Sequence, residues 1–329
     1  MIITQTPLRI SLAGGGTDFR DYFVEHGGAV VSSAIDKYVY VIIKERFDEL
    51  IIVNYSKKEI REAVPDLQHE LVRGAMETTE LSRGVEITTL ADIPSQGSGL
   101  GSSSSVTVGL LHACHAYRGN LVDAEQLAEE ACDIEINKAK KPIGVQDQYI
   151  AAFGHLRLLV FERGGRVTAR RLDMTESFRR KLGGNLMLFY TGRTRSSASI
   201  LSEQKERLTA NKTMLDSLKA IAFELAQNLE KGEADAVGSA LREGWDVKRK
   251  LAPGITNPSL NELIQRAIGA GAIGGKIAGA GGGGFLLLYV PGPVQDEVRE
   301  ALKGLRELPF HLERDGSKVI FNLRGYETK

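Results

Sequence analysis

The chain has 329 residues, of which 42% are hydrophobic and 26% are charged, with 42 basic and 42 acidic side chains. This balance is typical of a folded protein, and it argues against intrinsic disorder and against a polyanionic partner such as nucleic acid. The length predicts two lobes with a large core.

The start of the chain and its cysteines indicate the compartment. MIITQTPLRI has no basic segment followed by a long apolar stretch, and no window reaches the roughly 18 apolar residues that a membrane span requires. Cys114 and Cys132 both lie in helical patterns, where we expect free thiols and no disulfide framework. We therefore expect a soluble, cytoplasmic protein without a membrane partner; the sequence carries no signal for an oligomeric state.

The first half of the chain is rich in strand signals. Runs of β-branched and aromatic residues predict strands over residues 2–12, 29–46, 50–55 and 85–90, and a hairpin over residues 156–172 that turns at Gly164 and Gly165. The spacing of apolar residues predicts helices over residues 18–25, 66–82, 102–117 and 123–137.

Helical patterns dominate the second half. They cover residues 196–230, 233–251, 259–270 and 294–304, with strands predicted at residues 186–190, at 285–290 and near the C-terminus. The change from a strand-rich to a helix-rich pattern near residues 175–185 predicts a boundary between two lobes, residues 1–178 and 179–329. The predicted fold class is therefore α+β.

The 36 glycines cluster in three places, and the central cluster reads PSQGSGLGSSSS over residues 94–105. Its glycines precede the helix that begins near Ser102. Glycines allow backbone N–H groups to converge on an anion, and a helix N-terminus adds unpaired donors and a positive dipole end. A flexible linker is the alternative, but linkers are not normally embedded between a strand and an amphipathic helix. We predict a phosphate-binding loop; it is not a Walker loop, because no Gly-x-x-x-x-Gly-Lys-Ser/Thr occurs.

The last cluster, residues 279–284, formally matches the Gly-x-Gly-x-x-Gly fingerprint of dinucleotide-binding folds. That fingerprint stands between a strand and a helix, whereas here a predicted strand follows at once. We interpret the cluster as a tight loop that lets backbones approach closely. The first cluster lies in PLRISLAGGGTD, residues 7–18, where one basic and one acidic side chain accompany the glycines.

In this order, the three clusters resemble the galacto-, homoserine, mevalonate and phosphomevalonate (GHMP) kinase family. Its motifs are a Pro-x-Arg-Ile near the N-terminus, a central Pro-x-x-x-Gly-Leu-Gly-Ser-Ser loop and a C-terminal glycine-rich segment, and here they span residues 7–284. The resemblance implies an ATP-dependent kinase with an N-terminal lobe like the second domain of ribosomal protein S5 and a ferredoxin-like C-terminal lobe. The central loop departs from the motif by one extra residue near Gln96.

Phosphoryl transfer requires neutralised phosphate charge, an aligned hydroxyl and a group that orients the hydroxyl or accepts its proton. The segment GVQDQY, residues 144–149, matches a family motif whose Asp is the proposed base. The resemblance therefore implies Asp147 as the base, with Arg9 close by to keep it ionised and to stabilise transition-state charge. Without the motif, Asp147 reads as a loop residue in a turn and Arg9 as a surface arginine. The residues expected to bind the ATP phosphates are Gly97, Ser98, Gly99, Leu100, Gly101, Ser102, Ser103 and Ser104.

Magnesium prefers hard oxygen ligands and usually keeps several waters, so one hydroxyl and one carboxylate suffice. The resemblance implies that Ser103 supplies the hydroxyl. For the carboxylate, Glu135 lies seven residues after Ala128 on the apolar face of the helix predicted over residues 123–137. An inward glutamate requires a partner, and we predict that Mg²⁺ is that partner.

The acceptor pocket of this family is shaped in part by the first cluster. Galactokinases carry a Glu-His pair where this chain has Gly15 and Gly16, so two side chains that read sugar hydroxyls are absent. This turn, together with PIGVQDQY at residues 142–149 and Thr191-x-x-x-Arg195, makes the chain most similar to the D-glycero-D-manno-heptose 7-phosphate kinases, which phosphorylate the anomeric hydroxyl. The resemblance implies a sugar phosphate as the small-molecule partner. The residues expected to line its site are Gly15, Gly16, Thr17, Asp18, Arg195, Lys248, Gly281 and Gly282, with Arg193 as a weaker candidate.

Two other functions stay open at this point. A fucokinase-like or other neutral-sugar 1-kinase shares the Gly-Gly-Gly-Thr-Asp turn and would not need Arg195 to hold a substrate phosphate. A non-catalytic sensor of ATP and sugar would not need Arg9, Ser103, Glu135 and Asp147 together. Solvated charges at helix starts are an equally good interpretation of Arg195 and Lys248.

Overall fold

In the computed structural model, which describes residues 1–93, 97–193 and 197–323, strands β1 (Ile2–Ala13) and β2 (Gly28–Glu45) form a long antiparallel ribbon. Its register shifts between Pro7 and Leu8 and again between Ser11 and Ala13. Such irregularities bend a strand pair. The two ends of β2 accordingly pair with different strands, its N-terminal end with β6 (Leu156–Phe161) and its C-terminal end with β5 (Val85–Ala91).

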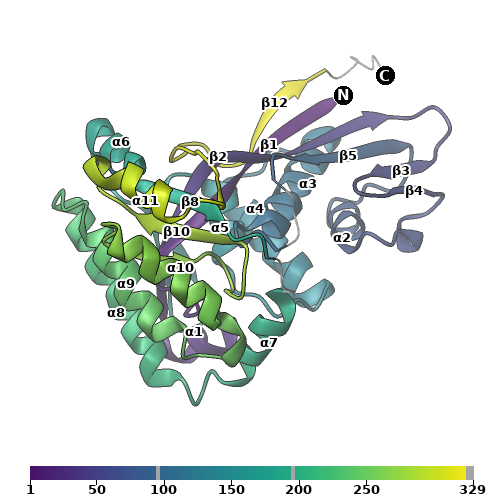
Figure 1. Ribbon diagram of the computed structural model, residues 1–329. Coiled ribbons are helices and arrows are strands. Elements are labelled where there is room, and N and C mark those ends of the chain that lie inside the picture. The colour runs from purple at the N-terminus through teal and green to yellow at the C-terminus, as the bar shows by residue number, and fades with distance from the viewer. Residues whose placement is uncertain (94–96, 194–196, 324–329) are drawn as a thin grey trace.

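The larger sheet has the strand order β12-β1-β2-β5-β3-β4, and β6 joins it through β2 and is followed by β7. β12 pairs with β1, so the last strand lies beside the first one, as Figure 1 shows. The remaining strands of this sheet are β3 (Ile51–Asn54), β4 (Lys58–Arg61), β7 (Val167–Arg171) and β12 (Lys318–Asn322).

The smaller sheet is antiparallel, with the order β11-β8-β10-β9. Its strands are β8 (Leu186–Tyr190), β9 (Gly274–Ile277), β10 (Phe285–Tyr289) and β11 (Arg306–Glu307). All four lie after residue 179, whereas β12 returns to the larger sheet. The division of the chain into residues 1–178 and 179–329 stays a prediction.

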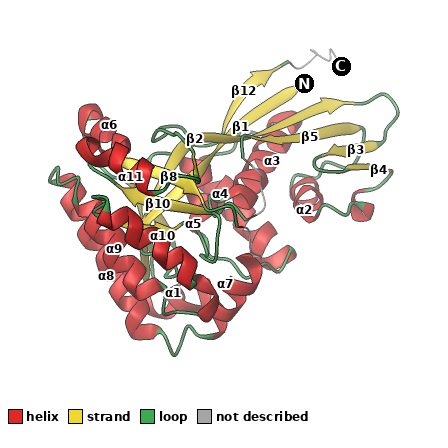
Figure 2. Ribbon diagram, viewed as in Figure 1, coloured by secondary structure: helices red, strands yellow, loops and turns green. Residues whose placement is uncertain are grey.

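Helices cover both sheets, so the α+β class is confirmed (Figure 2). α3 (Ser102–Arg118) and α5 (Gln146–Phe153) pack against β1 and β2, and α9 (Ala236–Lys248) contacts both β1 and β9 and so joins the two sheets. The other helices are α1 (Arg20–His26), α2 (Glu70–Thr78), α4 (Ala124–Cys132), α6 (Glu176–Gly184), α7 (Ser197–Glu206), α8 (Lys212–Glu230), α10 (Pro258–Gly269), α11 (Gln295–Ala301), the 3₁₀ turns Val64–Asp66, Pro253–Ile255 and Gly292–Val294, and a π-helix, η2 (Asp133–Lys138).

Two long helices predicted from sequence differ in the structure. The helical pattern over residues 196–230 is divided into α7 and α8. Asn211, just before α8, is buried and donates its side-chain amide to the backbone oxygen of Leu251 at 2.8 Å. The pattern over residues 123–137 changes at Asp133 from an α-helix to the π-helix η2. Single π turns inside α-helices are frequent at functional sites.

The predicted helix over residues 66–82 is shorter in the structure, where α2 covers Glu70–Thr78. The sequence analysis does not predict strands β4 and β9, since β4 is mostly charged and β9 contains two glycines. Among the helices of the described residues, none is long and apolar enough to span a bilayer.

Candidate active site

The described part of the central loop begins at Gly97 and leads directly into α3. Gly97, Gly99 and Gly101 have φ angles of 72°, 74° and 78°, in the left-handed region that glycine adopts without a steric penalty. No side chain caps the first turn of α3, so its N–H groups remain available to a ligand. This arrangement favours an anion in front of Ser102. Gln96, the extra residue of the motif, lies outside the described residues.

The central and last glycine clusters pack backbone against backbone. A Cβ on Gly99 would lie 2.5 Å from the oxygen of Ala278, and a Cβ on Gly279 would lie 2.7 Å from the Cα of Gly99. A Cβ on Gly284 would lie 2.6 Å from the oxygen of Gly97. The last cluster is therefore a close-approach loop, as predicted, and β10 follows it where a dinucleotide fingerprint would have a helix.

Arg9 and Asp147 meet beside the central loop. Arg9 donates Nε to Oδ1 of Asp147 at 2.6 Å and Nη2 to Oδ2 at 2.5 Å, and its Nη1 binds the backbone oxygen of Gly99 at 2.7 Å. The side chain of Arg9 is only 5% exposed, while that of Asp147 is 22% exposed. Asp147 lies in the first turn of the short helix α5. The sequence analysis does not predict this helix and interprets the segment as a loop.

Glu135 is fully buried on η2 and accepts hydrogen bonds from three neutral side chains. Ser103 donates to Oε1 at 2.5 Å, while Ser104 and Gln148 donate to Oε2, each at 2.7 Å. The ammonium of Lys141 lies 2.8 Å from Oγ of Ser103 and 3.3 Å from Oε1 of Glu135. The inward orientation predicted for Glu135 is therefore confirmed, and the structure brings Ser103 and Glu135 into direct contact.

One hydroxyl and one carboxylate oxygen form a hard donor pair that suits Mg²⁺ when phosphate oxygens and waters complete the shell. Within the described ranges no group of three or more His, Cys, Asp and Glu side chains could hold a metal by itself. The residues present therefore fit a metal that arrives with a nucleotide.

Asp18 lines the same small cavity as Asp147, at the start of the acceptor region. Its Oδ1 accepts the N–H of Gly16 at 2.9 Å, and its Oδ2 accepts the side-chain amide of Gln146 at 2.9 Å. Asp18 is 4% exposed, and a Cβ on Gly144 would lie 2.0 Å from its Oδ2. Thr17 is fully buried, and its hydroxyl bonds the backbone of Gly14 and Ala29, so Thr17 shapes the turn and does not present its hydroxyl to a ligand.

Lys248, at the end of α9, reaches the same region. Its ammonium donates to the oxygen of Gly279 at 2.7 Å and lies 3.5 Å from the position of a Cβ on Gly15. The pKa of Lys248 is lowered to about 8, mainly by burial and also by Arg9, while Asp18 and Asp147 oppose the shift.

Three buried polar atoms beside Asp18 and Lys248 have no hydrogen-bond partner in the described part of the chain. They are Oγ of Ser11, Oε1 of Gln146 and Nε2 of Gln204. A buried polar group without a partner costs about 1–3 kcal/mol. A cluster of such groups around one cavity is arranged for a ligand that carries its own donors and acceptors.

Two adjoining cavities collect these residues. The larger, about 460 Å³, lies between the central loop, Lys141 and the last glycine cluster. The smaller, about 70 Å³, is lined by Ser11, Asp18, Gln204 and Lys248 among others. Both are lined by Arg9 and Asp147, which therefore stand at the junction of a phosphate-binding part and a polar acceptor part.

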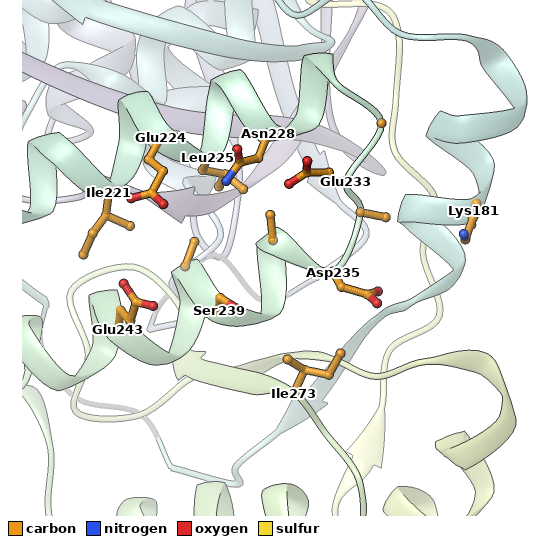
Figure 3. A pocket seen from close by; sticks show the side chains of 14 residues that line it. Lys181, Ile221, Glu224, Leu225, Asn228, Glu233, Asp235, Ser239, Glu243 and Ile273 are labelled. Atoms are coloured by element: carbon orange, nitrogen blue, oxygen red, sulfur yellow. The ribbon is translucent and has the colours of Figure 1, made fainter.

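A further cavity of about 640 Å³ lies far from these residues along α8 and α9. Figure 3 shows its acidic lining, formed by Glu224, Glu233, Asp235 and Glu243, with Lys181 at one end. Four carboxylates repel a polyphosphate, so this cavity is not a nucleotide site.

Of the basic residues predicted to bind the substrate phosphate, the structure describes Lys248 and Arg193 but not Arg195. Arg195 lies outside the described residues, and the backbone oxygen of Arg193 accepts the N–H of Gly284 at 2.8 Å. Lys276 on β9 is a second buried lysine, 5% exposed, and burial together with the nearby charge of Lys248 holds its pKa well below the ordinary lysine value. Gly281 and Gly282 have positive φ angles within the last glycine loop.

Sequence reasoning missed Ser11, Lys141, Gln204 and Lys276. For Gln204 a signal existed, because it follows the buried Ile200 by four residues on the inner face of α7, where a polar side chain requires an explanation. Ser11 likewise lies on a buried strand. Lys141 is the last residue of a charged segment, KAKK at residues 138–141, that reads as solvated, and no pattern distinguishes it.

Two family models match the chain. The GHMP kinases N terminal domain matches residues 60–155, and the GHMP kinases C terminal model matches residues 225–307. Together they cover more than half of the chain.

Named relatives cover most of the chain. It is 29% identical over 316 residues to the D-glycero-alpha-D-manno-heptose 7-phosphate kinase of Campylobacter jejuni, spanning 92% of this chain and 93% of that protein. A crystal structure of a D-glycero-D-manno-heptose 1-phosphate kinase from Bacteroides thetaiotaomicron is 26% identical, with a TM-score of 0.83 and coverage of 99% of this chain and 100% of the other. The L-fucokinase/L-fucose-1-P guanylyltransferase of Bacteroides fragilis is 28% identical over 88% of this chain, which matches only 34% of that longer protein.

Proposed function

The chain belongs to the GHMP kinase family and is a sugar kinase that transfers phosphate to a hydroxyl group, and we propose that its acceptor is the anomeric hydroxyl of D-glycero-D-manno-heptose 7-phosphate. Enzymes of this family use ATP as the phosphate donor, typically with Mg²⁺. The observation that carries the proposal is the position of Asp147, held by Arg9 between a glycine loop and a cavity lined by unpaired polar atoms.

Asp147 is the proposed base. A carboxylate at the junction of the two cavities can accept the proton of an acceptor hydroxyl as the oxygen attacks the terminal phosphate. Arg9 binds both carboxylate oxygens, which fixes the orientation of the group. The guanidinium also adds positive charge near the transferring phosphate.

The phosphates of ATP would bind the loop from Gly97 to Ser104. Its left-handed glycines and the uncapped start of α3 supply backbone N–H donors. Ser103 and Glu135 would hold the magnesium ion, which neutralises phosphate charge when bound. Glu135 keeps its position because Ser104 and Gln148 bind the oxygen that faces away from Ser103.

A polyhydroxylated acceptor suits the smaller cavity. Ser11, Gln146 and Gln204 each leave a buried polar atom unpaired among the described residues, and sugar hydroxyls can donate to or accept from all three. Asp18 adds an acceptor beside the Gly15–Gly16 turn, where a Cβ on Gly16 would lie 2.6 Å from Nε2 of Gln204. An acceptor without hydroxyl groups would leave these atoms unpaired.

The phosphate of a sugar phosphate needs a cation. Lys248 is the described candidate, since its ammonium faces the acceptor cavity, and Arg195 remains a prediction from the sequence. One relative is named a heptose 7-phosphate kinase and the other a heptose 1-phosphate kinase, and both names agree with this charge.

The test is a coupled ADP-release assay with a panel of hexoses, heptoses and their terminal phosphates. We expect turnover with the heptose 7-phosphate at a KM far below that for the same sugar without phosphate. Preferential turnover of fucose or another neutral sugar would overturn the substrate assignment. Nucleotide binding without turnover of any member would instead favour a sensor.

A further inference from the structure

The ammonium of Lys141 lies on the two oxygens proposed for the metal. It is 2.8 Å from Oγ of Ser103 and 3.3 Å from Oε1 of Glu135. A second carboxylate, that of Glu70, lies 3.4 Å away. Lys141 therefore occupies a cation position between one hydroxyl and two carboxylates.

The chain builds this position with a local backbone constraint. Lys140 has a φ of 52°, a left-handed conformation that a residue with a side chain rarely adopts. The N–H of Lys141 then turns back and binds the backbone oxygen of Glu135 at 2.9 Å. The π-helix η2 and the Lys140 turn thus bring the lysine onto the glutamate that lies six residues earlier.

A cation is required at this place whether or not a metal is bound. Glu135 is completely buried, and an ionised carboxylate without a compensating charge is expensive in a protein interior. Ser103, Ser104 and Gln148 are neutral donors, so Lys141 is the charged partner within hydrogen-bonding reach. A divalent ion bound to Ser103 and Glu135 would compete with the Lys141 ammonium for the same two oxygens.

We propose that Lys141 is a built-in counter-cation of the metal site, which holds Glu135 in the absence of metal and is displaced when the metal–nucleotide complex binds. The inference rests on the metal role proposed for Ser103 and Glu135. Lys141 is 23% exposed and lines the same cavity as the glycine loop, so a displaced ammonium stays next to the nucleotide phosphates. Phosphate charge compensates the lysine that the metal displaces.

This exchange makes metal entry depend on the nucleotide. A free divalent ion must compete with a tethered ammonium and binds weakly. A metal that arrives with a nucleotide brings phosphates that receive the ammonium, so the two ligands bind with positive coupling. Lys141 is a positioning residue for this step and needs no contact with the acceptor sugar.

Binding of Mn²⁺, followed by the loss of its free-ion electron paramagnetic resonance signal, tests the proposal without catalysis. Wild type, Lys141→Met, Lys138→Met and Glu135→Gln would be titrated with and without ADP. Lys138 is the matched control, because it lies on the same turn but binds Thr78 at 2.7 Å. Association of Mn²⁺ with ADP in solution is the same for all variants, so differences report on the protein.

We expect Lys141→Met to bind free Mn²⁺ about 5- to 150-fold more tightly than wild type, the usual range of a coupling between sites, and to lose most of the ADP-dependent gain in Mn²⁺ affinity. Lys138→Met should behave as wild type. Equal or weaker binding of free Mn²⁺ by folded Lys141→Met would overturn the proposal. If that variant does not fold, the titration of wild type tests the proposal by itself. Tight binding of free Mn²⁺ by wild type, with no gain in affinity when ADP is added, would contradict the proposal.

The Glu135→Gln titration separates this inference from the function on which it rests. Loss of Mn²⁺ binding with ADP in Glu135→Gln, together with wild-type behaviour of Lys141→Met, would leave the metal site in place and remove only the role of Lys141. Unchanged Mn²⁺ binding in Glu135→Gln would remove the metal site itself, and the lysine proposal with it.

Discussion

Arg9 and Asp147, which lie on β1 and α5, face each other through two parallel hydrogen bonds of 2.6 and 2.5 Å. This two-point geometry fixes the plane of the carboxylate, and the third bond of Arg9, to the oxygen of Gly99, ties that plane to the glycine loop. The proposed base is therefore positioned relative to the phosphate loop by one arginine.

Replacement of Asp147 by Asn should remove the base and keep the shape of the site. We expect kcat to fall by about 10²- to 10⁴-fold, the usual contribution of general base catalysis, while ATP affinity changes little. Steady-state ADP release and nucleotide titration measure the two quantities. Asp173→Asn, at a side chain that is 90% exposed, is the control and should be neutral. An unchanged kcat in Asp147→Asn would show that Asp147 is not the base.

Gly99 should tolerate no side chain. Its φ is 74° and an added Cβ would lie 2.5 Å from the oxygen of Ala278, so Gly99→Ala must separate the two glycine clusters. Gly232 has a φ of 86° with open space around it, and Gly232→Ala isolates the conformational cost, about 1–2 kcal/mol. We expect Gly99→Ala to lose clearly more unfolding free energy than this control and to weaken ATP binding. Equal losses in denaturant titrations would show that the contact between the clusters is unimportant.

The sequence predicts most of what depends on local pattern. The strand over residues 2–12, the glycine loop before Ser102 and the inward face of Glu135 follow from periodicity and turn chemistry, and the structure contains all three. Pairing between distant segments has no local signature. The return of β12 to β1 and the packing of Gly99 against Gly279 become visible only when the chain is folded.

Single residues of the acceptor cavity are equally hard to predict from the sequence. Ser11 and Gln204 lie nearly two hundred residues apart, on a strand and a helix whose patterns each look ordinary. What distinguishes them is an atom without a partner, which depends on the tertiary surroundings. Lys141 is similar, because its role follows from a left-handed Lys140 that propensity does not predict.

Lys248 predicts a pH dependence of substrate binding. Its pKa is about 8 in the folded protein and near 10.5 ordinarily, so the ammonium that attracts a phosphate is lost above about pH 8. We expect the KM for a sugar phosphate to rise between pH 8 and 9.5, and Lys248→Met to show a higher KM without that rise. Between the two pKa values the unfolded chain binds more protons, so stability should increase with pH in the same range. A KM that is flat with pH in wild type would contradict the role of Lys248.

Ser103 and Ser104 bind different oxygens of Glu135, and their alanine variants should differ accordingly. Ser103 is exposed to the cavity, so Ser103→Ala removes a metal ligand and should raise the Mg²⁺ concentration for half-maximal activity about tenfold, equivalent to roughly 1.4 kcal/mol. Ser104 is buried, and Ser104→Ala leaves the carboxylate short of a donor, which should cost about 1–3 kcal/mol of unfolding free energy. Magnesium titrations and chemical denaturation distinguish the two, and the reverse assignment would contradict the proposed ligand.

Gln204 offers a test in which stability and activity move in opposite directions. In the free protein its side-chain N–H groups are buried next to Gly16 without a partner among the described residues. Gln204→Met keeps the volume and removes the unpaired donor, so we expect a gain of about 1 kcal/mol in unfolding free energy together with a higher KM for the acceptor.

The matched control for that gain is Gln5, whose amide donates to the hydroxyl of Tyr40 at 3.1 Å far from the cavities. Gln5→Met breaks a bond that exists, so it should lower stability slightly and leave KM unchanged. Thermal melting with and without sugar phosphate measures both variants: the substrate should raise the melting temperature of wild type more than that of Gln204→Met, because only wild type gains a partner for the buried amide. If Gln204→Met lost stability and bound the acceptor as wild type does, the amide would belong to the fold and not to the acceptor site.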